Sequence, residues 1–141
     1  MTLHIPAALL NQVRHEGERA YPAECCGAIA GAVNGDKRAI RLYPLANRRT
    51  DDPHRYLIEA EQLRSVEGDV RANNWEILGF YHSHPDHPAV PSEFDTSHAW
   101  PWYSYLIVAV AEGRAGSAAS WVLDPDQPRM QRETLDVESE V

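Results

Sequence analysis

The sequence has few cysteines, and their arrangement excludes several kinds of site. Its only two, Cys25 and Cys26, are adjacent. Neighbouring residues of a strand point to opposite faces, so a disulfide between these two would be strained. No CxxC motif is present for zinc or redox chemistry. We therefore expect both cysteines to be small, buried, apolar side chains.

Long hydrophobic runs and clusters of positive charge are absent as well. The longest apolar run, residues 105–111, is strand-sized and far shorter than the roughly 20 residues that span a bilayer. The N-terminal residues lack a basic segment before an apolar core, so we expect no signal peptide and a cytoplasmic location. The net charge of −8, with no basic cluster longer than Arg48–Arg49, argues against nucleic-acid binding. We predict no membrane or nucleic-acid partner.

The hydrophobic pattern predicts one α/β domain over residues 1–141, with a sheet of hairpins and crossovers and two or three flanking helices. Apolar spacing predicts helices over residues 6–20, 59–73 and 92–99. Residues 34–36 read as a tight turn, 47–53 as a loop and 138–141 as a frayed end. Strands are expected over residues 24–31, 38–44, 55–58, 75–81, 104–111 and 118–123, with an edge strand over 129–137.

The chemistry-bearing groups gather in residues 79–95, which read GFYHSHPDHPAVPSEFD. His82 and His84 are two apart, so in a strand their side chains leave the same face. Two imidazoles on one face can bind one zinc ion at about 2.0–2.1 Å each. A third ligand from Asp95 would leave the fourth tetrahedral position to water, which distinguishes a catalytic zinc from a structural one.

Two simpler interpretations compete with this metal site. Histidines in a strand are often only hydrogen-bonded polar residues. Ser92 and Asp95 also have the spacing of a helix N-cap and its third residue. The cap and the metal site compete for the same side chains but not for the backbone, because a helix beginning at Ser92 would hold Asp95 rigidly in its first turn.

The string resembles the signature of the JAMM (MPN-plus) zinc metalloproteases, an upstream glutamate followed by H-[ST]-H-P-x6-S-x2-D. Every fixed position of the second half is present: His82, Ser83, His84, Pro85, Ser92 and Asp95. The sequence around Glu24, Tyr-Pro-x-Glu-Cys-Cys-Gly, is similar to the region where the family carries its glutamate. The resemblance implies a compact prokaryotic-type member with a curved mixed β-sheet of the cytidine-deaminase-like type, flanked by helices.

The resemblance also implies a role for each site residue. His82, His84 and Asp95 would bind one zinc ion with water as the fourth ligand. Glu24 would be the general acid and base, and Ser92 would donate a hydrogen bond to the developing oxyanion.

The alternative for Glu24 is a solvent-exposed carboxylate at a strand edge. Other candidate bases are Glu59, Glu76 and Glu93. Of these, Glu76 would lie about 20 Å from His82 along an extended strand, and Glu93 reads as a helix-surface residue. His87 is close to His84 in sequence, but it lies outside the family pattern and reads as a surface or substrate-facing residue. The remaining histidines show no pattern: His4, His15, His54 and His98.

The implied reaction is hydrolysis of an amide or isopeptide bond at the C-terminus of a ubiquitin-like or sulfur-carrier protein that ends in Gly-Gly. A strand edge near residues 55–58 or the loop 85–91 could hold such a tail by β-augmentation. Two alternatives come from other classes: a non-catalytic scaffold subunit, or a zinc hydrolase or deaminase of small molecules. The H-x-E and P-C-x-x-C motifs of zinc deaminases are absent.

Overall fold

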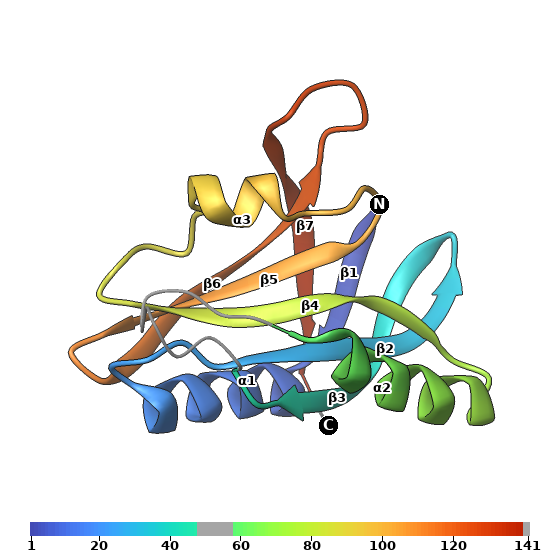
Figure 1. Cartoon of the computed structure of the whole chain (residues 1–141), viewed down its shortest axis with the longest axis horizontal. Coiled ribbons are helices and arrows are strands. Elements are labelled where there is room, and N and C mark those ends of the chain that lie inside the picture. The colour runs from blue at the N-terminus through green and yellow to red at the C-terminus, as the bar shows by residue number, and fades with distance from the viewer. Residues whose placement is uncertain (48–57, 140–141) are drawn as a thin grey trace.

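The structure, a computed structural model, describes residues 1–47 and 58–139. Seven strands and three helices are present in these two ranges (Figure 1). They are β1 (Thr2–Pro6), α1 (Ala7–Ala20), β2 (Cys26–Asn34), β3 (Asp36–Leu45), α2 (Ala60–Ala72), β4 (Glu76–Pro85), α3 (Glu93–Ser97), β5 (Ser104–Ala111), β6 (Arg114–Leu123) and β7 (Met130–Glu138).

The seven strands form one mixed sheet in the order β1-β3-β2-β4-β5-β6-β7, which closes as a barrel where β7 pairs with β1. β4 and β5 run parallel, and the hairpins β2–β3, β5–β6 and β6–β7 are antiparallel. The prediction of a mixed sheet is confirmed. The edge strand predicted near the C-terminus is wrong in its placement, because β7 pairs with β6 on one side and with β1 on the other.

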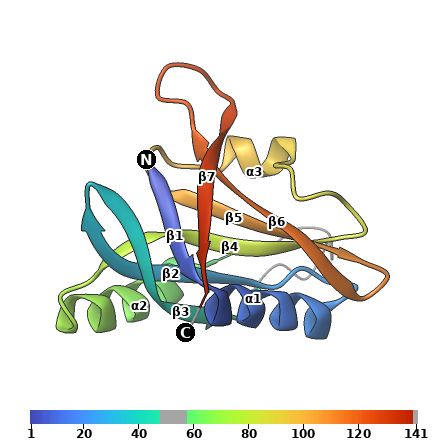
Figure 2. The same ribbon diagram turned by 180° about the vertical axis from the view of Figure 1, so that it is seen from behind.

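The helices lie on two sides of the sheet. In Figures 1 and 2, α1 and α2 run below the strands, whereas α3 lies above them at the end of the loop that follows β4. Leu10 and Val13 of α1 are buried in the main core, together with Leu78 of β4 and Leu106 of β5. No helix of the described part of the chain is long and apolar enough to cross a membrane.

The predicted elements are recovered with shifted ends. Pro6 directly precedes α1, a place where its missing N–H costs nothing. Helix α2 begins after a capping box between Glu59 and Gln62. Gly35 provides the positive φ of +75° at the predicted turn between β2 and β3. Both cysteines are buried and free of disulfides, as predicted.

Some predictions differ from the structure or lie outside it. Strand β1, with its alternating burial, was not predicted. The loop over residues 47–53 and the strand over 55–58 fall almost entirely outside the described residues, and Ile58 itself is not in a strand. Glu138 ends β7, so the frayed segment predicted from residue 138 begins too early.

Candidate metal centre

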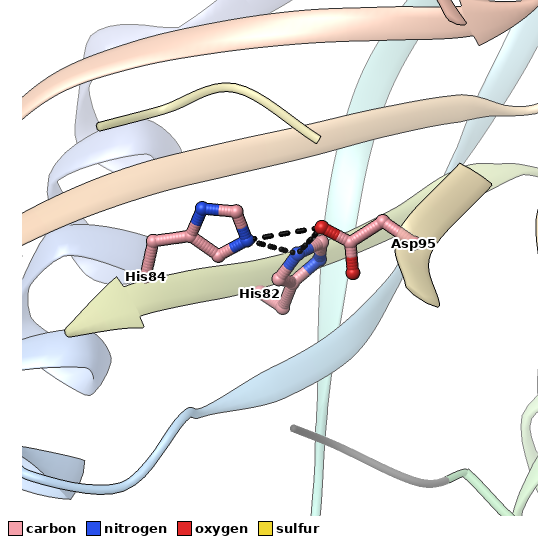
Figure 3. A group of neighbouring side chains, drawn as sticks. All are labelled: His82, His84 and Asp95. Atoms are coloured by element: carbon pink, nitrogen blue, oxygen red, sulfur yellow. Dashed lines mark hydrogen bonds and ion pairs between the residues drawn. The ribbon is translucent and has the colours of Figure 1, made fainter. Parts of the chain in front are cut away.

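Strand β4 holds both histidines in the interior of the sheet. It is paired with β2 on one side and with β5 on the other. His82 is fully buried and His84 is 6% exposed. The two rings leave the same face of β4, as their spacing predicts, and point toward Asp95 (Figure 3). The sequence predicts a strand over residues 75–81 with the histidines at its end, whereas β4 continues through both histidines to Pro85.

Asp95 belongs to the first turn of α3. The Oγ atom of Ser92 accepts a hydrogen bond from the Asp95 N–H at 3.1 Å, and Asp95 Oδ2 accepts one from the Ser92 N–H at 2.9 Å. This is a reciprocal capping box, so the helix-cap interpretation of Ser92 and Asp95 is correct. The cap does not remove Asp95 from the histidines. It fixes the carboxylate beside them.

The three side chains bring one atom each to a common point. The distance between His82 Nε2 and His84 Nε2 is 3.1 Å. Asp95 Oδ2 lies 3.3 Å from the first and 3.0 Å from the second. Ligand atoms at about 2.0–2.1 Å from a tetrahedral zinc ion are about 3.3 Å apart. The two nitrogens and one oxygen therefore fit zinc in both spacing and ligand type.

The three atoms share too few hydrogens to satisfy one another. His84 Nδ1 lies 2.9 Å from the carbonyl oxygen of Pro88, which can only accept. Nδ1 is therefore the donor, and the neutral ring presents a lone pair at Nε2. An ionised Asp95 has no hydrogen either, so only His82 Nε2 could supply one. A buried cluster of facing lone pairs is stabilised by a cation.

The electrostatics of the cluster favour the protonation states that metal ligands need. Burial lowers the pKa of His82 below its ordinary value, against the opposing influence of Asp95. Burial by itself would raise the pKa of Asp95. The close contacts with His82 and His84 and the hydrogen bond from the Ser92 N–H outweigh burial and hold that pKa well below its usual range. The imidazole of His82 is thus kept neutral and the carboxylate ionised.

Glu24 lies just before β2 and is 5% exposed, so the alternative of a solvent-exposed carboxylate is wrong. β2 pairs antiparallel with β4, with Cys26 opposite His82. The pairing continues toward the N-terminus, because Ser83 N–H donates to the Cys25 carbonyl and the Cys25 N–H donates to Ser83 Oγ at 2.9 Å. If this register continued by one more residue, Glu24 would lie opposite His84, on the same face as the two histidines.

The other candidates are exposed to solvent. Glu59 caps α2, Glu76 begins β4, and Glu93 is on the exposed side of α3. His87 is exposed on the loop after β4. Ser92 has an exposed side chain at the start of α3, where its Oγ accepts from Asp95 and keeps its own hydrogen for a further partner.

His4 is a histidine for which the sequence showed no pattern, yet it lies in a second group of acidic residues. Its Nε2 is 3.0 Å from Asp36 Oδ2 and its Nδ1 is 2.8 Å from Asp136 Oδ2. Because carboxylates only accept, both ring nitrogens serve as donors when the ring is charged. Hydrogen bonds to Asp36 and Asp136 accordingly raise the pKa of His4. In this group the charged ring of His4 donates one hydrogen bond to each of the two carboxylates.

An apolar pocket of about 250 Å³ adjoins Asp95 on the side of α3. Asp95 forms part of its wall, so a substrate group in the pocket would lie next to the metal. The apolar lining includes Leu63, Phe80, Phe94, Trp100 and Tyr105. Trp100 is 69% exposed and Tyr105 is 6% exposed, so the pocket extends from the surface into the core.

Comparison with known proteins defines the family. Residues 6–124 match the family described as prokaryotic homologs of the JAB domain. This match covers most of the chain and includes every residue of the site. The chain therefore belongs to the prokaryotic JAB-domain family, a branch of the JAMM/MPN proteins whose signature its sequence resembles.

Two curated relatives share this domain. The chain is 33% identical over 119 residues to the desampylase of Haloferax volcanii, covering 83% of each protein. It is 30% identical over 115 residues to a probable TtuB-protein conjugate cleaving protease of Thermus thermophilus, covering 82% of this chain and 75% of that protein. Among solved structures, protein DSY2949 of Desulfitobacterium hafniense matches with a TM-score of 0.85 and 27% identity, over 99% of this chain and 94% of that chain.

Proposed function

We propose that the protein is a zinc-dependent metallopeptidase that hydrolyses an amide bond at the C-terminus of a ubiquitin-like or sulfur-carrier protein. The observation that carries the proposal is the convergence of His82, His84 and Asp95 at zinc spacing with too few hydrogens among them. Two relatives named for the cleavage of protein conjugates support the substrate class. A Gly-Gly tail on the substrate and a cytoplasmic location stay predictions.

The site residues divide the work of hydrolysis. His82, His84 and Asp95 hold the ion, which when bound supplies a Lewis acid and lowers the pKa of water toward 7. Glu24 takes a proton from the attacking water and later delivers it to the leaving nitrogen, so that the C–N bond breaks and an amine departs. Ser92 donates its free hydroxyl hydrogen to the oxygen of the substrate carbonyl as negative charge develops there.

The substrate needs access to the ligand face and a place to bind. Every described strand has a neighbour on each side, but β3 pairs with β1 only at residues 37–38 and β6 pairs with β7 only at residues 120–123, so parts of both strands have no strand partner on that side. The apolar pocket next to Asp95 is the alternative. Its wall of aromatic and aliphatic side chains fits an apolar group close to the bond that is cleaved.

The first test is the metal content of the purified protein, measured by elemental analysis. We expect about one zinc ion per chain, and its loss together with activity in the double variant His82→Ala/His84→Ala. A wild-type protein that stays free of metal after equilibration with zinc would contradict the proposal. It would favour a non-catalytic scaffold, in which the capping box of α3 has only a structural role.

The second test separates the substrate classes. The zinc-loaded protein is incubated with a conjugate of a ubiquitin-like protein, with the same protein carrying one extra amino acid in amide linkage, and with small amides. Cleavage of either protein substrate supports the proposal. Turnover of the small amides alone would instead support a zinc hydrolase of small molecules.

A further inference from the structure

The metal site depends on one backbone carbonyl outside the ligand set. Pro88 O accepts the hydrogen of His84 Nδ1 at 2.9 Å and thereby leaves the lone pair of the neutral ring at Nε2. Nε2 is the atom that lies 3.0 Å from Asp95 Oδ2 and 3.1 Å from His82 Nε2. If Pro88 O moved away, the other tautomer would put a hydrogen where the metal should bind.

Pro88 belongs to the loop of residues 86–91, which connects the strand of two ligands to the helix of the third. This loop folds back over β5 and β6. Ala89 is 8% exposed and packs on Ile107 and Ala119. Those two residues are paired across β5 and β6, and Ile107 is in turn opposite His82. The loop therefore lies on the same face of the sheet as the metal ligands.

The first residue of the loop is fixed by several bonds. The Asp86 N–H donates to the Val110 carbonyl at 2.7 Å. The Asp86 side chain accepts from Tyr21 Oη at 2.6 Å and from the Glu112 N–H at 2.8 Å. These contacts place the beginning of the loop, two residues before the carbonyl that holds His84.

A side chain of β6 fixes the middle of the loop. Trp121 donates its Nε1 hydrogen to the carbonyl oxygen of Ala89 at 3.0 Å. This carbonyl belongs to the peptide unit immediately after that of Pro88. The Trp121 ring also packs against the cluster formed by Ala89, Ile107 and Ala119. One indole thus anchors the peptide next to the one that selects the His84 tautomer.

We propose that Trp121 is a positioning residue for the metal centre, acting through Ala89 and Pro88 on the tautomer and orientation of His84. The inference rests on the metal site of the proposed function. It gives Trp121 a role in metal affinity, although Trp121 lies 26 positions beyond Asp95, the last proposed ligand in the sequence. Groups that orient a ligating histidine typically change metal affinity by about 10–100-fold when removed.

The test is Trp121→Phe, which keeps an aromatic ring in the cluster and removes the N–H. Zinc affinity is measured by competition with a chromogenic chelator. We expect the zinc affinity to fall by about tenfold, the lower end of the 10–100-fold range. The effect is small because Trp121 does not contact His84 directly but acts through Ala89 and Pro88. The matched control is Trp75→Phe. Trp75 packs in a different cluster with Val66 and Val70 of α2, so we expect its variant to keep the wild-type affinity.

A second readout uses the metal-free protein. The ¹⁵N shifts of the His84 ring report which nitrogen carries the hydrogen. We expect the Nδ1–H form in the wild type and in Trp75→Phe, and a mixture of tautomers in Trp121→Phe. Thermal unfolding of the three metal-free proteins shows whether the effect is local, in which case Trp121→Phe unfolds near the temperature of Trp75→Phe.

The outcomes are distinct. Unchanged zinc affinity together with an unchanged tautomer in Trp121→Phe would overturn the inference, and so would an equal loss of affinity in Trp75→Phe. If the wild type binds no zinc, the proposed function fails, and the tautomer measurement on the metal-free proteins still decides the role of Trp121.

Discussion

Within the described part of the chain, a comparison of two buried clusters of polar side chains shows that they differ in how many hydrogens they hold. In the first, the converging atoms of His82, His84 and Asp95 have at most one hydrogen among them. In the second, Lys37 donates to Trp102 O, Ser104 Oγ and Glu133 Oε2, which uses all three ammonium hydrogens. The first cluster has fewer hydrogens than acceptors. In the second cluster every ammonium hydrogen of Lys37 is donated to an acceptor.

The second cluster completes its bonds through serine hydroxyls. Ser104 and Ser120 donate to Glu133 Oε1 at 2.6 and 2.8 Å. Lys37 is 1% exposed and Glu133 is 6% exposed, so the ion pair connects β3 with β7 inside the barrel. Burial lowers the pKa of Lys37, and Glu133 opposes that change. A buried polar cluster that is fully bonded specifies the fold, and one that lacks hydrogens marks a place for a cation.

The largest effect is expected for Glu24→Gln. The variant should retain zinc, since Glu24 is not among the three converging ligands, and hydrolysis should fall by about 10²–10⁴ because no carboxylate moves the proton. Turnover of the substrate and metal content are measured on the same sample. Glu76→Gln, an exposed glutamate at the start of β4, should change neither. Near-normal turnover of Glu24→Gln would remove Glu24 from the mechanism.

The second cluster is broken by Lys37→Met. Glu133 would be left as a buried carboxylate without its cation, so we expect the free energy of unfolding to fall by about 3–5 kcal/mol. Chemical denaturation measures the loss. The double variant Lys37→Met/Glu133→Leu should recover part of it, because no unpaired charge remains. Zinc stoichiometry should stay that of the wild type in any folded sample, and loss of zinc would show that the clusters are not independent.

Ser92→Ala tests a residue that caps α3 and that we propose also acts in the reaction. Removing the hydroxyl should lower hydrolysis by about 10²–10³ through the lost oxyanion donor. Loss of the cap should cost about 1 kcal/mol of stability, because the Asp95 N–H loses its acceptor. Ser97→Ala, in the same helix, is the control for activity. Ser92→Thr keeps the hydroxyl, and a large loss of activity in that variant would argue against the oxyanion role.

The smallest effect on stability is expected for a substitution of His4. This histidine lies in a further polar group with Asp36, Asp136 and Arg38. Hydrogen bonds to Asp36 and Asp136 raise the pKa of His4 above 6.5, so its contribution to stability is complete below pH 6.5 and disappears as the pH rises through the raised value. Asp36, whose pKa is lowered from 3.8, preserves the pair down to at least that pH.

Comparing the wild type with His4→Gln by denaturation at several pH values from 5 to 9 measures this contribution. We expect a difference in unfolding free energy at pH 5 that vanishes at pH 9. A pH-independent difference would contradict the assignment. Zinc in excess of one ion per chain would show instead that His4 also binds metal.

The sequence alone indicated which side chains form the candidate metal site. The two-residue spacing of His82 and His84 predicts that both side chains lie on one face of a strand, because strand side chains alternate whatever surrounds them. The spacing between Ser92 and Asp95 predicted that Asp95 lies in the first turn of a helix capped by Ser92, since capping is a local interaction. The helices over residues 7–20 and 60–72 were predictable from apolar spacing, which is also a local pattern.

Only the tertiary structure decided how distant segments meet. β1 and β7 pair across more than 130 residues and turn a predicted edge into a closed barrel. The Lys37–Glu133 ion pair and the bond from Trp121 to Ala89 also connect residues far apart in the chain. Such contacts depend on strand order and register, which a short-range pattern does not encode, and the carbonyl of Pro88 leaves no signal in a sequence because every residue has one.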